Sequence, residues 1–310
     1  MESCRVWYGR ELLALAKEDP TIVALDADLS RSTMSTFIEQ ELPQQFFEIG
    51  IAEQNMVGIA AGLALNGMKP FVHSFAVFLT GRAYDQIRQV IAYPALNVKL
   101  VGSSAGLSDF GDGATHQSLE DISLMRTLPN MIVISPADHV QTKAITNYLT
   151  GYRGPAYLRL SRAETEQIFP EDYRFALGKV DLLLQGDDLA IISTGTLTGT
   201  ALRAARRMEA QGIKATVINV STIKPLDRKD LLKAIGGIRR VLTIEEHSIY
   251  GGLGSTVAEI LIQEKCGYHL KSMGVRDLFG QSGENHQELL KHYQLTEDDL
   301  IAAAAALTSD

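Results

Sequence analysis

Two short segments in the first half of the chain carry side chains capable of acid–base chemistry. The segment Gly50-Ile-Ala-Glu53-Gln-Asn-Met places a carboxylate at the start of a helical pattern rich in Gly and Ala. The segment Asp112-Gly-Ala-Thr-His116-Gln places a carboxylate and an imidazole in a turn between an expected strand and an expected helix. A carboxyl group can move one proton, and an imidazole can polarise a reacting oxygen or exchange a proton with it. Together the two segments predict an active site.

Each segment also has a simpler interpretation. A glutamate in the first turn of a helix ordinarily stabilises the helix dipole, by about 0.3–1 kcal/mol. A turn that contains Gly and Thr often does no more than cap the helix that follows it. The functional interpretation therefore depends on the two segments occurring together.

The elements that must position these residues alternate along the chain. Short apolar, β-rich runs alternate with helical patterns, which predicts an α/β protein of two doubly wound domains, each a mostly parallel sheet flanked by helices. In the first half we expect strands at 21–26, 46–49, 71–74, 98–102, 131–135 and 157–160, and helices at 9–18, 53–65, 82–92, 119–127 and 137–149. In the second half we expect strands at 189–193, 214–220, 240–244 and 271–276, and helices at 197–211, 228–235 and 252–264, with two shorter helices within 285–306.

The regular alternation is lost between about residues 152 and 186. Gly154-Pro155, Phe169-Pro170 and Gly186-Asp-Asp188 interrupt this stretch, and such pairs mark turns and loops. We therefore expect a first domain over 1–165, a linker over 166–186 and a second domain over 187–310.

The composition excludes several classes of protein. The chain of 310 residues is 45% hydrophobic and 21% charged, as globular proteins are, and its net charge of -8 with scattered Lys and Arg argues against nucleic-acid binding. Cys4 and Cys266 lie far apart and form no metal-ligand spacing, which indicates a reduced protein. The N-terminus lacks the pattern of a signal peptide, and the sequence has no apolar run long enough for a membrane span. We expect a cytoplasmic protein.

The two acid–base segments resemble the pyrimidine-binding half of transketolase, a thiamine-diphosphate enzyme, and residues 189–310 resemble the C-terminal domain of the same family. The resemblance covers nearly the whole chain. It implies that Glu53 hydrogen-bonds N1′ of the aminopyrimidine and thereby activates the cofactor. It further implies that Phe75 and Phe78 stack on and flank that ring, and that Asp28 and Leu29 line the middle of the cofactor. Core packing is the alternative for these aromatic and leucine side chains.

The resemblance also implies a substrate site. Asp112 and His116 match residues that contact sugar hydroxyls near the reacting carbons, where His116 would act as an acid or base. Arg5, Ser32 and Arg162 match residues that bind the terminal anionic group. Ser104 stands where many members of the family carry a histidine, as Ser103-Ser-Ala-Gly-Leu replaces Thr-His-Ala-Gly-Leu. The loss of one cationic donor favours an altered anion such as a sulfonate, or an unusual sugar phosphate. A surface role is the alternative for each arginine.

The domain that binds the diphosphate of the cofactor is not recognisable in this chain. Gly111-Asp-Gly113 superficially copies its Gly-Asp-Gly motif, but no suitable asparagine follows. We therefore expect no metal ligands in this chain and a partner, the N-terminal transketolase subunit, that holds the diphosphate through Mg²⁺ or Ca²⁺. Two copies of each chain would form a heterotetramer.

The expected function is transfer of a two-carbon ketol unit from a ketose to an aldose by the C-terminal subunit of a split transketolase. A deoxyxylulose-phosphate synthase is an alternative, although that enzyme carries all its domains on one chain. The β subunit of a 2-oxoacid dehydrogenase is another, although it lacks the turn at 112–117. A non-catalytic scaffold subunit is a third. In the second domain, the turn at Gly251–Ser255 could bind a phosphate or simply connect a strand to a helix, and we expect His247 to be structural.

Overall fold

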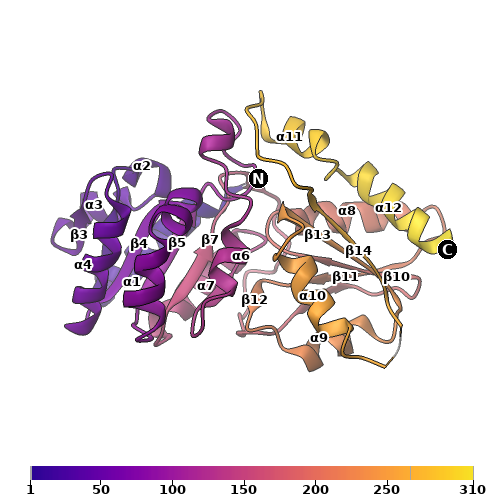
Figure 1. The fold of residues 1–310 in the computed structure, drawn as a ribbon, viewed down its shortest axis with the longest axis horizontal. Coiled ribbons are helices and arrows are strands. Elements are labelled where there is room, and N and C mark those ends of the chain that lie inside the picture. Colours follow the sequence, from indigo (N-terminus) through magenta and orange to yellow (C-terminus); the bar gives the residue numbers. More distant parts are fainter. Residues whose placement is uncertain (1, 266, 310) are drawn as a thin grey trace.

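The computed structural model describes residues 2–265 and 267–309, so Cys266 lies outside the described residues. Figure 1 shows two α/β domains side by side, the first coloured indigo to magenta and the second orange to yellow. Each domain is built on its own mostly parallel sheet with helices on its faces. The expected fold class is confirmed.

The first sheet has the strand order β12-β6-β7-β5-β4-β2-β3. Its strands from the first half of the chain are β2 (Ile22–Asp26), β3 (Phe46–Glu48), β4 (Lys69–Phe75), β5 (Lys99–Ser103), β6 (Ile132–Ile134) and β7 (Ala156–Arg159). These strands pair parallel with their neighbours. β2, β5, β6 and β7 are buried along their whole length, which explains why they read as unbroken apolar runs in the sequence. Each of the six overlaps an expected strand.

Helices cover both faces of this sheet. One face packs against α1 (Cys4–Glu18) and α7 (His139–Gly151) through Ile22, Ala24 and their neighbours. The opposite face, with Val23 and Leu25, packs against α4 (Glu53–Leu65), α6 (Asp121–Arg126) and a segment of π-helix. That segment comprises η2 (Phe78–Arg82), α5 (Tyr84–Gln86) and η3 (Ile87–Ala92), where a single helix over 82–92 was expected. Shorter elements that the sequence did not indicate are α2 (Ser30–Thr33), α3 (Thr36–Glu41), η1 (Pro43–Gln45) and η4 (Gly113–Thr115).

The second sheet has the strand order β14-β13-β10-β11-β9. Its strands are β9 (Asp181–Leu184), β10 (Leu189–Ser193), β11 (Ala215–Asn219), β13 (Arg240–Ser248) and β14 (His269–Val275). Its helices are α8 (Leu197–Glu209), α9 (Arg228–Ile235), α10 (Leu253–Leu261), α11 (His286–His292) and α12 (Glu297–Ser309). The strands and helices expected in this half are all found, with ends that differ by a few residues.

The expected boundaries between the domains need two corrections. β9 lies inside the stretch 166–186 that was expected to be a linker, because Leu183 and Leu184 pack against the core of the second domain. β12 (Thr222–Lys224) lies within the expected second domain but pairs antiparallel with β6 at the edge of the first sheet (Figure 1). A further short pair, β1 (Glu2–Ser3) with β8 (Glu164–Thr165), joins the N-terminus to the start of the expected linker. The two domains are therefore interleaved.

A buried polar contact attaches α1 to the centre of the first sheet. The Nδ1 of His73, on β4, donates a hydrogen bond to the Leu25 carbonyl at 3.0 Å, and its Nε2 accepts one from the Tyr8 hydroxyl of α1 at 2.7 Å. Burial lowers the pKa of His73 from 6.5 to about 4, so the imidazole stays neutral in the folded protein.

This contact predicts an acid-sensitive stability. Below pH 6.5 the unfolded chain protonates His73, whereas the folded chain does so only near pH 4, so the free energy of unfolding falls by about 1.4 kcal/mol per pH unit through this window. His73→Gln should lose this component, as measured by urea unfolding between pH 7 and pH 4.5. His269→Gln, at an exposed position on β14, is the matched control and should follow the wild type. Parallel curves for wild type and His73→Gln would contradict the prediction.

Candidate active site

The residues expected to form the site converge on one edge of the first sheet. β2, β3, β4, β5 and β7 run parallel, so their carboxyl ends meet at the same edge, where α/β proteins place their ligands. The expected site residues that lie at or after these ends are Asp28, Leu29 and Ser32 (β2), Glu53 (β3), Phe75 and Phe78 (β4), Ser104, Asp112 and His116 (β5), and Arg162 (β7). Arg5 reaches the same edge from the first turn of α1.

Glu53 is the first residue of α4 and is 1% exposed. Its Oε2 accepts a hydrogen bond from Arg82 Nη1 at 2.7 Å, while its Oε1 has only a long contact, 3.4 Å, with the Ser74 hydroxyl. A carboxylate oxygen that is buried and weakly bonded can accept a further strong hydrogen bond. Glu53 is therefore able to bind a ring N–H or a protonated nitrogen of a ligand.

An aromatic cluster lies beside this carboxylate. The rings of Phe75 and Phe78 are stacked at 6.1 Å, and the His116 ring meets both edge-on, at 6.0 and 5.2 Å. The Arg82 guanidinium lies 4.7 Å from the Phe78 ring and so joins the cluster to Glu53. The fold thus brings together Glu53, Phe75, Phe78 and His116, which the sequence places up to sixty-three positions apart (53 to 116).

A second cluster, the terminal-group cluster, comprises Arg5, Ser32, Asp109 and Arg162. Arg5 Nη1 donates to the Ser32 carbonyl at 2.8 Å, and Arg162 Nη1 lies 2.9 Å from Asp109 Oδ1. Burial first, and the positive charge of Arg162 second, lower the pKa of Arg5, whereas Asp109 opposes this shift. The three charges are therefore close enough to influence one another.

Ser104 follows β5 and has a positive φ of 55°. It is completely buried, and the structure gives its hydroxyl no hydrogen-bond partner among the described residues. The next backbone N–H, that of Ala105, donates to the Leu160 carbonyl at 3.1 Å, and the Ser108 hydroxyl accepts from the Arg162 N–H at 3.1 Å. Ser104 is therefore in the strand connection that runs alongside the chain leading to Arg162.

The other expected residues contact neither cluster directly. Asp28 is exposed, with a φ of 62°, and Leu29 is half-buried; their backbone N–H groups bond Glu48 and Asp26. Asp112 is exposed at the start of η4, four residues before His116. These positions leave both carboxylates available to a ligand or to another chain.

The second domain fixes the turn that carries Asp112 and His116. Gln117 Nε2 donates to the Gln281 carbonyl at 3.0 Å, and the Gly283 N–H donates to the Phe110 carbonyl at 2.9 Å. Gly113 has a φ of +75°, and a Cβ built on it would lie 2.8 Å from the backbone nitrogen of Ser282. The segment 280–283 therefore lies directly against this turn.

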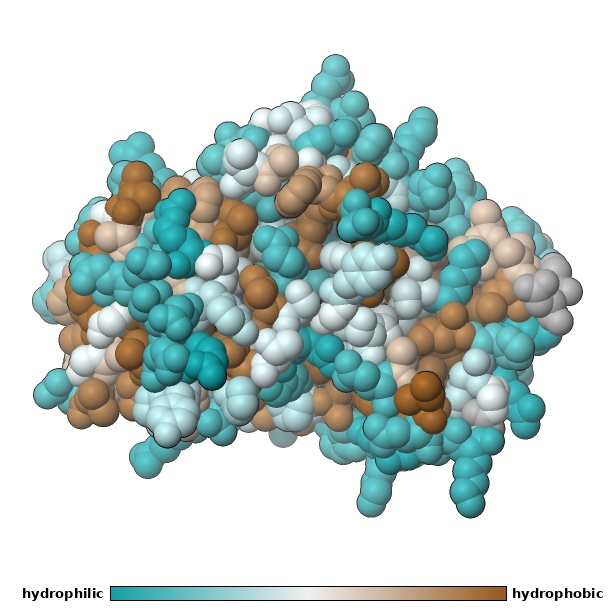
Figure 2. All heavy atoms as spheres, viewed as in Figure 1, coloured by the Kyte–Doolittle hydropathy of each residue, from teal (hydrophilic) through white to brown (hydrophobic). Residues whose placement is uncertain are grey.

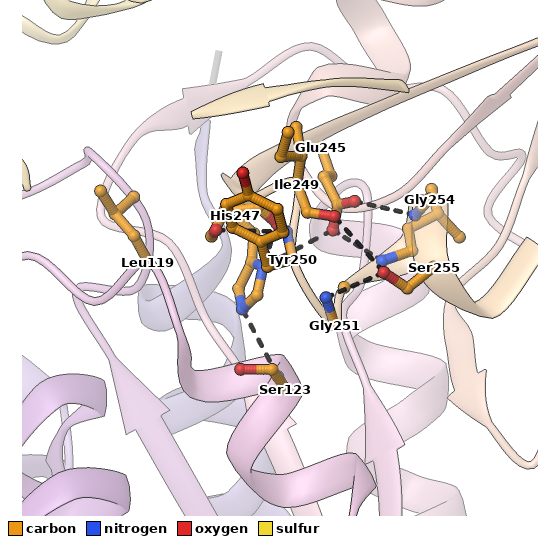
Figure 3. A network of polar contacts seen from close by, with 12 residues as sticks. Leu119, Ser123, Glu245, His247, Ile249, Tyr250, Gly251, Gly254 and Ser255 are labelled. Atoms are coloured by element: carbon orange, nitrogen blue, oxygen red, sulfur yellow. Dashed lines mark hydrogen bonds and ion pairs between the residues drawn. The ribbon is translucent and has the colours of Figure 1, made fainter. Parts of the chain in front are cut away.

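The glycine-rich turn of the second domain does not offer a phosphate site. The backbone N–H groups of Leu253 and Gly254, at the start of α10, donate to the buried Glu245 carboxylate at 2.7 and 2.8 Å (Figure 3). His247 donates from Nδ1 to the Ser248 carbonyl and accepts at Nε2 from the Ser123 N–H across the domain junction. The phosphate interpretation of this turn is wrong, because a carboxylate of the same chain already uses these donors.

Sequence reasoning missed two residues of the clusters, Arg82 and Asp109. Arg82 belongs to the π-helical segment, and such segments are frequent at functional sites. Asp109 stands two residues after Leu107 in the connection between β5 and α6. An arginine near an aromatic run and an aspartate near the Asp112 turn were local signals, but their partners lie 29 and 53 residues away.

The surface shows no segregation of apolar side chains. Brown and teal spheres are interspersed over both domains on the face that Figure 2 presents. Within the described residues, no helix is long and apolar enough to cross a membrane, and no three His, Cys, Asp or Glu side chains are grouped to hold a metal ion.

The fold and the site define a two-domain α/β protein with a carboxylate, an imidazole and an aromatic pair at one sheet edge. The chain belongs to the transketolase family. The family described as "Transketolase, pyrimidine binding domain" matches residues 3–167, and the one described as "Transketolase, C-terminal domain" matches residues 178–300. The resemblance seen in the sequence is confirmed, and with it a transferase.

Similar proteins have nearly the same length as this chain. It is 44% identical to the "putative transketolase C-terminal section" of Methanocaldococcus jannaschii, over 96% of this chain and 93% of that protein. It is 42% identical to the 6-deoxy-6-sulfo-D-fructose transketolase subunit of Clostridium sp., over 97% and 93%. A solved structure described as "Split gene transketolase, inactive beta4 tetramer" is 43% identical, with a TM-score of 0.91 over 100% of this chain and 99% of that one.

The contact between the turn and the second domain predicts the effect of a single methyl group. Gly113→Ala should lower the free energy of unfolding by roughly 1–3 kcal/mol, because the new Cβ meets the Ser282 backbone and the positive φ disfavours alanine. Gly111→Ala is the matched control, since its Cβ would meet no atom within 4 Å, and should leave the stability unchanged. Urea unfolding followed by circular dichroism measures both. Equal stability of the two variants would show that the second domain does not constrain this turn.

Proposed function

We propose that this chain is the C-terminal subunit of a heteromeric transketolase, which transfers a two-carbon ketol unit from a ketose to an aldose. The observation that carries this proposal is the buried Glu53 carboxylate, with one weakly bonded oxygen, beside the Phe75–Phe78 pair and His116. Close relatives matched over nearly their whole length are transketolase subunits by name, which supports a chain that acts as a subunit.

The donor set fits one end of thiamine diphosphate. An aminopyrimidine is flat, gains from contact with aromatic rings, and needs a carboxyl group at its ring nitrogen. Glu53 Oε1 would supply that group, Phe75 and Phe78 would pack on the ring, and Asp28 and Leu29 would line the next part of the cofactor. When bound, the cofactor supplies the carbon nucleophile and electron sink of ketol transfer.

The remaining residues would bind and orient the sugar. His116 is half-buried, and its Nδ1 is bonded to the Thr115 hydroxyl at 2.9 Å, so its Nε2 is directed elsewhere and can exchange a proton with a substrate hydroxyl. Asp112, exposed in the same turn, can accept from a second hydroxyl. Arg5, Ser32, Ser104 and Arg162 would surround the terminal anionic group, phosphorylated or sulfonated.

The proposed site is open on the side that a partner must cover. Asp28, Arg82 and Asp112 are exposed in this chain. The outer surface of α4, which begins with Glu53, exposes Gly58, Gly62 and Leu65, and no atom lies within 4 Å of a Cβ built on either glycine. Small residues on a helix surface allow another element to approach closely. A tetramer of one split-gene relative is described as inactive, as expected if such a subunit lacks half of the site.

The partner would be an N-terminal transketolase subunit that binds the diphosphate through Mg²⁺ or Ca²⁺, with two copies of each chain. This arrangement explains why the described residues of this chain offer a pyrimidine site without a group of metal ligands. Cofactor pockets commonly form between domains or subunits in this way.

Replacement of the carboxyl group by an amide tests the role of Glu53. In the complex with the partner subunit and thiamine diphosphate, Glu53→Gln should lower the rate of ketol transfer by at least about 100-fold, because an amide cannot exchange a proton. Assembly, measured by light scattering, should be unchanged. Glu18→Gln, at the exposed end of α1, is the matched control and should have normal activity. Normal turnover by Glu53→Gln would remove this residue from the mechanism.

A large side chain on α4 tests the partner surface. Gly62→Arg should fold normally, because no atom of this chain lies near the new Cβ and arginine favours a helix more than glycine does. It should fail to associate with the partner subunit in size-exclusion chromatography with light scattering. Gly62→Ala, which adds a single methyl group, is the control and should still associate. Association of Gly62→Arg at the wild-type concentration would exclude this surface.

A further inference from the structure

The terminal-group cluster contains a negative charge that an anion-binding site would not be expected to hold. The Asp109 side chain is 3% exposed, and its Oδ1 pairs with Arg162 at 2.9 Å. Its Oδ2 is also buried and has no hydrogen-bond partner among the described residues. One oxygen of the carboxylate is therefore neutralised by the arginine, while the other is not.

The cluster has a small net charge as a result. Arg5 and Arg162 contribute two positive charges and Asp109 one negative charge, so the sum is +1. The influence of all three on one another is seen at Arg5, whose pKa is lowered by burial and by Arg162 and held up by Asp109. A phosphate monoester carries about -1.5 to -2 charges at pH 7, whereas a sulfonate or a carboxylate carries a single charge at that pH.

Ser104 adds no charge to compensate. It is completely buried, and its hydroxyl is neutral and without a partner among the described residues. A hydroxyl can donate one hydrogen bond to an oxyanion but contributes nothing to its Coulomb attraction. The second negative charge of a phosphate would therefore meet the Asp109 carboxylate with no additional cation to offset the repulsion.

We propose that the terminal-group cluster selects sugars whose end carries a single negative charge, such as a sulfonate, over phosphate monoesters, and that Asp109 sets this preference. The inference rests on the proposed ketol transfer for its biological meaning and narrows the substrate class of that same site. Arg5 and Arg162 bind the oxyanion, and Asp109 acts on it through its charge and through its contact with Arg162.

Binding to the isolated chain tests the charge preference, because all four residues of the cluster belong to this chain. Calorimetric titration should show that the wild type binds methanesulfonate more tightly than methyl phosphate at pH 7.5. Asp109→Asn should bind methyl phosphate at least about tenfold more tightly than the wild type does, with a smaller change for methanesulfonate. Acetate as a third probe separates a sulfonate preference from a preference for any monoanion.

Two further variants protect the conclusion from other causes. Ser104→His adds a donor that can be cationic and leaves Asp109 in place, so it should also shift the preference towards methyl phosphate. Asp187→Asn removes an exposed carboxylate in the turn before β10 and should change neither affinity, which excludes an effect of net charge alone. Stronger binding of methyl phosphate by the wild type, an unchanged preference in Asp109→Asn, or binding of neither anion by any variant would overturn the proposal.

The complete enzyme gives the second measurement. With the partner subunit and thiamine diphosphate, the ratio of kcat/KM for a 6-sulfonated to a 6-phosphorylated ketose should exceed one in the wild type and fall at least about tenfold in Asp109→Asn. Failure of the wild type to transfer a ketol unit from any ketose would refute the proposed function. The anion titrations would still decide the charge preference, so the two failures are distinguishable.

Discussion

A buried carboxylate at the domain junction holds the part of the chain that carries most of the candidate site. Glu246, on β13, accepts from the Leu107 N–H at 2.6 Å and the Thr196 hydroxyl at 3.0 Å, and its Oε1 lies 3.1 Å from His286 Nε2. Burial would raise the pKa of Glu246, but His286, Arg159 and the Leu107 N–H hold it below the ordinary value. Gly106, with a φ of +69°, leaves room for this side chain, since a Cβ there would lie 2.5 Å from Glu246 Oε1. The connection after β5 is therefore anchored to the second domain where it leaves the sheet.

The second domain therefore contributes to the site without placing a side chain in it. Glu246 fixes the start of the connection between β5 and α6, and the segment 280–283 lies against its middle, beside Gly113 and Gln117. At its far end, the Ser248 N–H donates to the Leu119 carbonyl at 2.7 Å (Figure 3). Asp109, Asp112 and His116 all lie between these anchors. A flexible connection would have to be ordered by the ligand, whereas this one is ordered by folding, which reduces the entropic cost of binding.

The sequence predicted the sheet and the local motifs well because both depend on neighbouring residues. β2 and β5 are buried on both faces, so their apolar runs could be recognised without knowing their partners. Glu53 was correctly placed at the first residue of α4. β12 and β9 could not be assigned in the same way, because each is short and is defined by pairing with a distant strand. The interaction of Asp109 with Arg162 likewise joins two connections that only the folded sheet brings together.

The two carboxylates of the candidate site show how similar ion pairs can serve opposite ends. Glu53 and Asp109 are both buried, and in each an arginine binds one carboxylate oxygen at 2.7 or 2.9 Å. The second oxygen of Glu53 has a weak contact with Ser74 beside stacked aromatic rings, where a ligand N–H can reach it. The second oxygen of Asp109 is enclosed near the terminal-group arginines, where it can only repel an anion. Because a buried charge acts over several ångströms at the low effective dielectric constant of a protein interior, one carboxylate can attract the cofactor while the other limits the charge of the substrate.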